Sequence, residues 1–362
     1  MKAHTKKLHP ILKVIISILL AVLIIAAAYF LYVVIAYHRV PDMQALEVTE
    51  HTKLVAETGK TYTAMTYNIG FGAYTSDYGF FMDGGTQSWA NSKESVIENT
   101  NRMVDLIQVY DPDFIMLEEV DVDGTRSYHV DEKTMIFSRM LRYDCTGAVS
   151  YDSPFLMYPF NEPHGKNKSV LAVLSRFNIS SALRRQLPIE ESLMKFLDCD
   201  RCYSVNRIPV ENGKELIVYA SHLSAYTSDG TVSDKQLELL VEDMQSEYDK
   251  GNYVILGADF NKDLLIDSSK YFGKPDIVYT WAQPLKLDLS GTGLNLQAPI
   301  NPIHPVPTCR NADGPYHKGQ FVVTIDGFIT SDNIEVISNQ VIDSGFAYSD
   351  HNPVVIEFKL KD

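Results

Sequence analysis

Eight acidic, amide and imidazole side chains in this sequence stand at or near the ends of apolar runs. Asn68, for example, follows Ala-Met-Thr-Tyr, and His222 follows Ile-Val-Tyr-Ala-Ser. A strand holds such a side chain rigidly while its tip reaches a cleft shared with other strand ends. Taken singly, each is more typical of a turn or a surface group, and only the joint occurrence indicates an active site. The eight are Asn68, Glu119, His222, Asp259, Asn261, Asp326, Asp350 and His351.

Six short motifs carry these residues in order along the chain. They are Met65-Thr66-Tyr67-Asn68, Leu117-Glu118-Glu119-Val120, Ser221-His222-Leu223, Gly257-Ala258-Asp259-Phe260-Asn261, Ile325-Asp326-Gly327-Phe328-Ile329 and Ser349-Asp350-His351-Asn352-Pro353. With these motifs, the chain resembles the endonuclease/exonuclease/phosphatase superfamily, also called DNase I-like, over Thr61 to Leu360. The resemblance implies an α/β fold, a four-layered sandwich of two packed mixed sheets flanked by helices. It also implies metal-assisted attack of water on phosphorus.

Three of the eight residues are predicted metal ligands. Mg²⁺ prefers oxygen ligands and keeps several waters, so the carboxylate of Glu119 and the amide oxygen of Asn68 suffice beside a substrate phosphate. Asp350 is a further candidate ligand, although an aspartate beside a turn can also cap it. The predicted cofactor is therefore Mg²⁺ or Mn²⁺.

The other five residues are predicted to act on the water and the phosphate. By the resemblance, Asp259 and Asn261 take the proton of the attacking water or orient it. His351 and His222 would contact the non-bridging phosphate oxygens, where negative charge accumulates. Asp326 is expected to hydrogen-bond His351 and favour its protonated form, and the alternative is that Asp326 caps a turn.

Apolar runs of strand length must position these residues. Helical patterning separates some of the runs: Asn91 and Glu94 can form a capping box ahead of an apolar face, and Asp111-Pro112 ends that helix. A second amphipathic helix is predicted for Asp234–Tyr248. The predicted strands are Tyr62–Tyr67, Phe114–Leu117, Val170–Leu174, Tyr203–Pro209, Leu216–Ala220, Tyr253–Leu256, Phe321–Ile329 and Val354–Phe358.

Two long irregular stretches, Phe71–Ala90 and Leu264–Gln320, interrupt this pattern. Loops of this length in a compact domain usually bear function or are mobile, and surface decoration is the alternative. The first stretch is rich in aromatic residues, which are predicted either to contact a lipid or headgroup or to belong to the core. They are Tyr74, Tyr78, Phe80, Phe81 and Trp89.

An apolar segment near the N-terminus predicts a membrane anchor. Residues 14–36 form an uncharged run that is about 34 Å long as a helix, against a hydrocarbon core of about 30 Å. Four lysines precede it, so the N-terminus (1–13) is predicted to be cytoplasmic and the rest to lie outside the cell membrane. A cleaved signal peptide is the alternative. Residues 37–60 are predicted to be a stalk and 61–362 the catalytic domain.

The charge distribution bears on the substrate. The chain carries −14, and residues 1–40 contribute +5, so the remainder carries −19. Such a field opposes sequence-blind binding to a nucleic acid backbone. A lipid headgroup, a nucleic acid and a small molecule all remain candidate phosphoesters. A sphingomyelinase-like phospholipase C fits the membrane setting, and a secreted nuclease remains open if a local basic rim forms from Lys166, Lys168, Arg176, Arg310 and Lys318.

Two further interpretations of the sequence concern a non-catalytic role and the four cysteines. A catalytically silent binding module is the alternative from another class, and no obligate protein partner is inferred. The four cysteines, Cys145, Cys199, Cys202 and Cys309, permit disulfides without fixing their pairing. Cys199-Asp-Arg-Cys202 has redox or zinc spacing, but without a second pair we favour a local structural bridge or free thiols.

Overall fold

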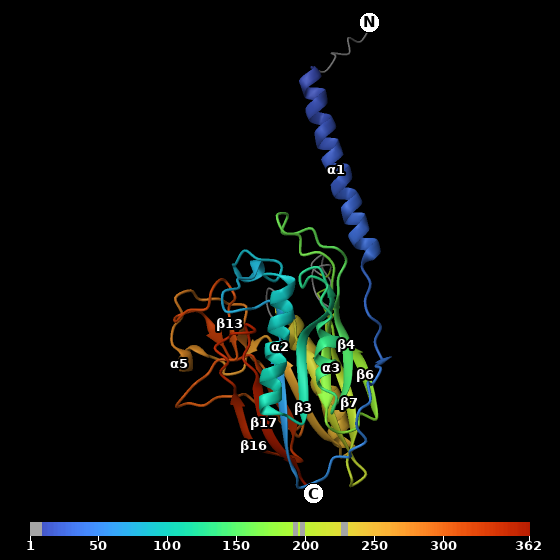
Figure 1. The fold of residues 1–362 in the computed structure, drawn as a ribbon, viewed down its shortest axis with the longest axis vertical. Helices are drawn as coiled ribbons and strands as arrows, with labels where there is room; N and C mark the ends of the chain where they lie inside the picture. The colour runs from blue at the N-terminus through green and yellow to red at the C-terminus, as the bar shows by residue number, and fades with distance from the viewer. Residues whose placement is uncertain (1–8, 191–194, 196–199, 226–230) are drawn as a thin grey trace. The chain divides into compact units, whose positions relative to one another are not determined.

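The computed structural model describes residues 9–190, 195, 200–225 and 231–362, and it contains two units, Met1–Arg39 and Val40–Asp362. The first unit contains helix α1 (Pro10–Ala36), drawn in blue in Figure 1. The helix is long and apolar enough to cross a membrane, and a signal sequence would meet the same criterion. Of the four lysines that precede the apolar run 14–36, Lys13 lies within α1, and the other three lie outside the described residues.

Two large mixed sheets form the centre of the second unit. Strand β2 pairs with β3, and β8 with β9, in parallel, whereas the other neighbours within these sheets are antiparallel. The seven-stranded sheet contains, in spatial order, β1 (Gln44–Ala45), β6 (Ser181–Gln186), β7 (Cys202–Pro209), β8 (Glu215–His222), β9 (Tyr253–Asp259), β15 (Asp326–Ser331) and β12 (Leu294–Gln297). The six-stranded sheet contains β16 (Ile334–Val341), β17 (Val354–Leu360), β2 (Thr61–Asn68), β3 (Phe114–Gly124), β5 (Asn167–Ser175) and β4 (Asp144–Asp152).

Helices cover the outer faces of both sheets. Helices α2 (Lys93–Tyr110) and α3 (Glu132–Arg139) pack on the six-stranded sheet, as Figure 1 shows, and α4 (Thr231–Asp249) packs on the seven-stranded sheet. Between the sheets lies a third apolar layer, to which Phe114 and Met116 of β3 and Val218 of β8 belong. The predicted four-layered α/β sandwich is therefore confirmed. The short elements are η1 (Gly70–Gly72), η2 (Phe81–Asp83), α5 (Ser269–Phe272), β10 (Lys262–Asp263), β11 (Gln283–Pro284), β13 (Cys309–Arg310) and β14 (Val322–Val323).

Helix α2 follows its sequence pattern except at its start. The predicted apolar face is buried, and the chain leaves the helix at Asp111 in a left-handed conformation. The cap, however, is Ser92, whose Oγ accepts a hydrogen bond from the N–H of Ser95 at 3.0 Å. Asn91 instead accepts from the side chain of Gln87, because the helix begins one residue later than a cap at Asn91 requires.

Residues 40–60 of the predicted stalk (37–60) belong to the second unit and pack on it. Gln44 and Ala45 form strand β1 against β6, and Leu46 packs beside the core. Further along, Thr49 bridges Cys145 and Ala56 bridges Val210. These backbone hydrogen bonds and apolar contacts explain why residues 40–60 belong to the second unit despite their polar composition.

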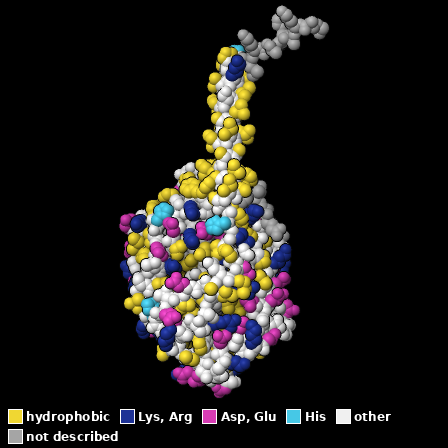
Figure 2. Space-filling model, turned by 90° about the vertical axis from the view of Figure 1, so that its right-hand side faces the viewer, with side chains coloured by type: hydrophobic (Ala, Val, Ile, Leu, Met, Phe, Trp, Pro, Cys, Tyr) yellow, Lys and Arg dark blue, Asp and Glu magenta, His cyan; other side chains and the backbone are white. Residues whose placement is uncertain are grey.

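Charged side chains of both signs are interspersed on the surface. Figure 2 shows Lys and Arg scattered among Asp and Glu on the face it draws, with no continuous basic stripe there. Two members of the predicted basic rim are neutralised by neighbours: Arg176 pairs with Asp111, and Lys168 lies 3.3 Å from Asp152. A stripe that follows a nucleic acid backbone is therefore not present on this face.

Candidate active site

The register of the strands brings the motif residues to one edge of the sandwich. Asp259, the last residue of β9, pairs with Asp326 at the start of β15 on one side and with His222 at the end of β8 on the other. In the other sheet, Asn68 ends β2 and pairs with Glu118 of β3. The ends of two facing sheets thus supply one group of polar side chains.

Glu119 is presented by an irregularity in β3. Its φ of 56° lies in the left-handed region, and the pairing of β3 with β5 shifts register between Leu117 and Val120. A non-glycine residue held there costs of order 1–3 kcal/mol and persists only where the surroundings fix it. The bulge turns Glu119 toward the pocket while Glu118 stays fully buried between the sheets.

Asp259 is the point at which several polar groups meet. Its Oδ2 accepts a hydrogen bond from Nδ2 of Asn68 at 3.0 Å, and its Oδ1 accepts from the backbone N–H of Asn261 at 2.9 Å. Nε2 of His222 and Nε2 of His351 lie 3.5 and 3.7 Å from Oδ2. Burial, opposed in part by His351, raises the pKa of Asp259 to about 7. The carboxyl group is thus poised to exchange a proton near neutral pH.

The two histidines differ in charge. Nδ1 of His351 donates to Asp326 at 2.9 Å, the hydrogen bond expected from the sequence. Burial lowers the pKa of His351, but the Asp326 carboxylate and other acidic neighbours outweigh this and raise it well above its ordinary value. Burial and the cation of Arg201 hold the pKa of His222 well below its ordinary value. His351 is therefore cationic and His222 neutral at neutral pH.

The carboxylates of Glu119 and Asp350 face the same pocket. Burial and the charge of Glu119 raise the pKa of Asp350 to about 6, against the opposing charges of His351 and Arg310. Two oxygen donors that repel one another in a partly open pocket suit a hard divalent cation. The amide oxygen of Asn68, the third predicted ligand, accepts a hydrogen bond from the N–H of Gly70, and its Nδ2 faces Glu119 at 3.4 Å. The two carboxylates fit such a cation, and the role of Asn68 as a ligand stays a prediction.

Seven of the eight predicted residues line a single pocket, and Asp326 lies behind His351. The rest of the lining was not foreseen, because it comes largely from irregular segments without periodic patterning. It consists of Tyr74, Asp83, Arg201, Ala225, Trp281, Cys309, Arg310, Asn311 and Ile325. Arg310 had a signal in the sequence as a member of the predicted basic rim, and Tyr74 had one as an aromatic residue of the first irregular stretch.

The two long irregular stretches, Phe71–Ala90 (the first insertion) and Leu264–Gln320 (the second insertion), contact one another and build one wall of this pocket. The guanidinium of Arg310 donates to the backbone carbonyls of Thr75 and Tyr78, and the N–H of Phe80 donates to the carbonyl of Ala312. Within the first insertion, Tyr74, Tyr78 and Phe80 are buried in an apolar cluster of their own. Of the two predicted roles, Tyr78 and Phe80 therefore take the core role, whereas Tyr74 packs in the same cluster and also lines the pocket.

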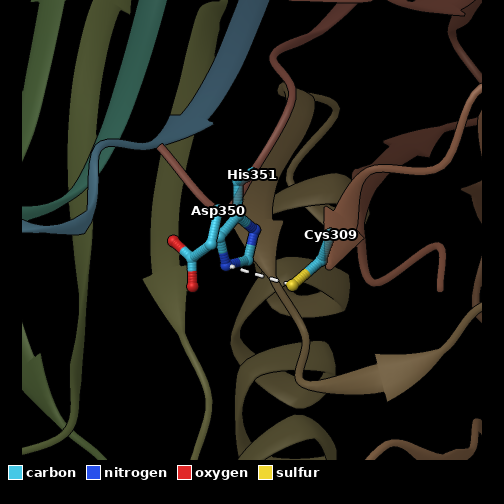
Figure 3. Close-up of side chains that lie close together, drawn as sticks. All are labelled: Cys309, Asp350 and His351. Carbon is cyan, nitrogen blue, oxygen red and sulfur yellow. Dashed lines mark hydrogen bonds between the residues drawn. The ribbon is translucent and has the colours of Figure 1, made fainter. Parts of the chain in front are cut away.

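Cys309 is the least expected residue of the pocket. Strand β13 places its Sγ 3.6 Å from Nε2 of His351, next to Asp350, as Figure 3 shows. Burial raises the pKa of the Cys309 thiol to about 12, so it is protonated at neutral pH. Cys145 and Cys202 are likewise free thiols. The two predicted alternatives for the Cys199-Asp-Arg-Cys202 pair were a local bridge or free thiols; Cys199 lies outside the described residues.

The comparison with protein-family models identifies the family of the chain. The family model described as "Endonuclease/Exonuclease/phosphatase family" matches residues 65–351, which include all eight candidate residues. No curated protein sequence matches the chain.

Solved structures with the same fold share little sequence with this chain. An endonuclease/exonuclease/phosphatase from Beutenbergia cavernae DSM 12333 is 17% identical with a TM-score of 0.55, covering 83% of this chain and 72% of its own. The catalytic domain of human Nocturnin with bound sulfate is 18% identical with a TM-score of 0.53, covering 87% and 97%. ANGEL2, a 2',3'-cyclic phosphatase in complex with adenosine-2',3'-vanadate, is 15% identical with a TM-score of 0.55, covering 88% and 99%. At these identities the likeness shows the fold alone.

Proposed function

Because the chain belongs to the endonuclease/exonuclease/phosphatase family, we propose that it is a membrane-anchored hydrolase that cleaves a phosphoester with the help of Mg²⁺ or Mn²⁺. The observation that carries this proposal is the group around Asp259, in which a carboxyl of raised pKa, a cationic His351 and a neutral His222 converge. Groups whose pKa values are driven apart in one pocket are typical of acid and base catalysis.

Asp259 is the proposed general base. A pKa of about 7 lets the carboxylate accept a proton from the attacking water at neutral pH. Asn68 and Asn261 each donate an N–H to its oxygens, so both asparagines fix the direction in which the free lone pairs point. The side chain of Asn261 is itself held by the carbonyl of Leu223 at 2.7 Å.

The two histidines are proposed to bind the phosphate. The Nε2–H of cationic His351 and an N–H of neutral His222 can donate to the non-bridging oxygens as negative charge accumulates on them. Asp326 acts behind His351 as a positioning residue, because it fixes the ring orientation and favours the charged form.

Glu119 and Asp350 are the proposed metal ligands. When bound, the divalent cation supplies charge that polarises the phosphoryl oxygen. Asn68 is assigned a different part: its N–H holds the Glu119 carboxylate at 3.4 Å, and its amide oxygen is a ligand only if the amide turns over.

The test is turnover by the full chain in detergent on bis-p-nitrophenyl phosphate with Mg²⁺. We expect Asp259→Asn to lower kcat by about 10²- to 10⁴-fold, because it removes the base while keeping the shape. Asp343→Asn, on an exposed turn outside the pocket, is the matched control and should retain activity. Metal-independent turnover, or no turnover on any phosphoester of a panel of DNA, lipid and small esters, would sink the proposal.

The proposed location is the cell membrane, with α1 as a single span. The positive charge near the start of the helix supports a cytoplasmic N-terminus and a catalytic unit outside. Protease added to intact cells should then digest the catalytic unit. Protection of that unit would contradict the orientation, and loss of the N-terminal segment from the mature chain would identify a signal peptide instead.

A lipid phosphodiester is the second candidate for the substrate, favoured by the loop between β4 and β5. This loop, green in Figure 1, exposes 40% of Phe155, 63% of Tyr158 and 81% of Phe160 to solvent. Exposed aromatic residues next to one another are typical of interfaces with lipids or proteins. The aromatic insertion that the sequence singled out is largely core, so this loop is the better candidate for lipid contact.

Vesicles separate this candidate from a nuclease. On sphingomyelin-containing vesicles, Tyr158→Ser with Phe160→Ser should lower turnover about 10-fold through loss of buried apolar area, while turnover of soluble bis-p-nitrophenyl phosphate stays unchanged. Efficient cleavage of DNA together with inert vesicles would favour the nuclease and discard the lipid candidate.

A further inference from the structure

Cys309, His351 and Asp350 bring a sulfur, a nitrogen and a carboxylate oxygen within 4.8 Å of one another. Cys309 and His351 are 3% and 5% exposed, and Asp350 is half-buried on the lining of the pocket, so an ion from solvent can reach all three. The side chains of Asp350 and Cys309 lie on either side of the imidazole in Figure 3. Sulfur is a poor ligand for Mg²⁺ and a good one for Zn²⁺.

The spacing of the sulfur and the nitrogen matches a zinc site. Zn²⁺ binds thiolate sulfur at about 2.3 Å and imidazole nitrogen at about 2.0–2.1 Å in tetrahedral geometry, which places the two ligand atoms about 3.5–3.6 Å apart. Sγ of Cys309 lies 3.6 Å from Nε2 of His351. A zinc ion therefore fits between the sulfur of Cys309 and Nε2 of His351 without movement of the backbone at either residue.

The opposite nitrogen of the same imidazole has the partner that metal-bound histidines use. A ligating histidine almost always donates its other ring N–H to a carboxylate or carbonyl, which fixes the tautomer and orients the free lone pair. Asp326 accepts from Nδ1 of His351 at 2.9 Å. Nε2 is thus directed at the sulfur by a contact independent of Cys309.

We propose that Cys309, His351 and Asp350 form a zinc site that overlaps the active site and inhibits the enzyme when it is filled. The inhibitory part rests on the proposed function, because zinc on Nε2 removes the donor assigned to the phosphate and withdraws Asp350 from the catalytic cation. The fourth position is left for water. Binding deprotonates the thiol and displaces the Nε2 proton, so affinity rises with pH.

Direct binding tests the site without any substrate. The full chain in detergent is titrated with Zn²⁺ by calorimetry and with Co²⁺ by absorbance, since a Co²⁺–thiolate bond gives a near-ultraviolet charge-transfer band. We expect one tight site and a thiolate band. Cys309→Ala and Cys309→Ser should both abolish the band and weaken Zn²⁺ binding by about 100-fold, and Asp326→Asn should weaken it about 10-fold or more.

The matched control is Cys202→Ala. It removes a cysteine of Cys199-Asp-Arg-Cys202, the pair whose spacing in the sequence is typical of zinc sites. Retention of the tight site in Cys202→Ala and its loss in Cys309→Ala would support the proposal. The reverse pattern, or no thiolate band in the wild type, would overturn it.

Inhibition by zinc is measured in a turnover assay, separately from binding. Micromolar Zn²⁺ should lower Mg²⁺-supported turnover of the wild type at least 10-fold more than that of Cys309→Ser. Equal inhibition of the two would overturn the inhibitory part, whereas a zinc site in a chain without any turnover would overturn the proposed function and leave the site standing.

Discussion

Strand ends and long insertions build opposite parts of one pocket, and they hold their side chains in different ways. Asp259, Asp326 and His222 are fixed by direct pairing between neighbouring strands. Arg310 is fixed by hydrogen bonds to the backbone of the first insertion, and Trp281 is fixed by a hydrogen bond from its Nε1 to Asn311 within the second. The strand side carries the groups that can act on phosphorus, and the insertion side carries the groups that can select what reaches them.

The largest expected effect tests the strand side. His351→Ala should lower kcat by about 10²- to 10³-fold, because it removes a charged donor from the site of accumulating charge. Asp326→Asn should have a smaller effect that shifts the alkaline limb of the pH profile to lower pH, since His351 loses the carboxylate that stabilises its charge. Steady-state kinetics at several pH values measures both. An equal loss of kcat on mutation of Trp281 would break the division between the two sides.

The strand side could be predicted from the sequence for a physical reason. A buried strand is a continuous apolar run, so a polar residue at its end stands out, as Asn68 and Asp259 do. Family motifs then supplied roles for these residues. Their mutual distances could not be predicted, because they depend on pairings such as Asp326 with Asp259 across 67 residues of chain.

The rest of the fold was harder to predict where sequence patterns are weak. Strand β16 has only one buried residue, Ile334, and several polar side chains, and it was missed because it lies at a sheet edge. Cys309 sits in the two-residue strand β13, which has no periodicity of its own. Its position beside His351 arises from an isolated backbone bridge between the two residues, a contact that only the folded chain defines.

The second effect concerns stability at His164, which lies in the loop between β4 and β5 and contacts Ser88 of the first insertion. Burial and the charge of Arg126 lower the pKa of His164 to about 3, and Oγ of Ser88 lies 3.0 Å from its Nδ1. The folded state keeps this ring neutral, whereas the unfolded chain binds a proton below about pH 6.5. The free energy of unfolding should therefore fall by about 2 kcal/mol between pH 6.5 and pH 5 on account of this residue.

Urea unfolding at both pH values measures this effect. His164→Asn, which keeps a polar atom near the position of Nδ1, should remove this part of the pH dependence, while buried His222 contributes equally in both proteins. An unchanged slope in the variant would show that the loop opens locally before the ring is protonated.

A smaller effect is expected for substrate binding at Trp281, which is half-buried in the pocket wall. Trp281→Ala should raise KM about 10-fold with kcat within about threefold, because the ring contacts parts of the substrate that do not react. Trp281→Phe should recover most of the loss by keeping an aromatic face. A fall in kcat without a change in KM would place Trp281 with the reacting groups, and the division of roles between strand ends and insertions would then not hold.

The smallest expected effect is on the free energy of unfolding, and it compares a buried tyrosine of the first insertion with a buried tyrosine of strand β7. Tyr78 of the first insertion is fully buried, and no partner for its Oη lies within the described residues. Tyr203 of β7 is equally buried, but its Oη donates to Asp243 at 2.7 Å. Tyr78→Phe should change the free energy of unfolding by less than about 0.5 kcal/mol. Tyr203→Phe should cost about 1 kcal/mol or more, since the Asp243 carboxylate loses the hydrogen bond from Tyr203 and keeps, within the described part of the chain, only the pairing with Arg185 at 3.5 Å. A large loss for Tyr78→Phe would mean that its hydroxyl meets a bound water, and that the insertion holds its wall by polar contacts as well as by packing.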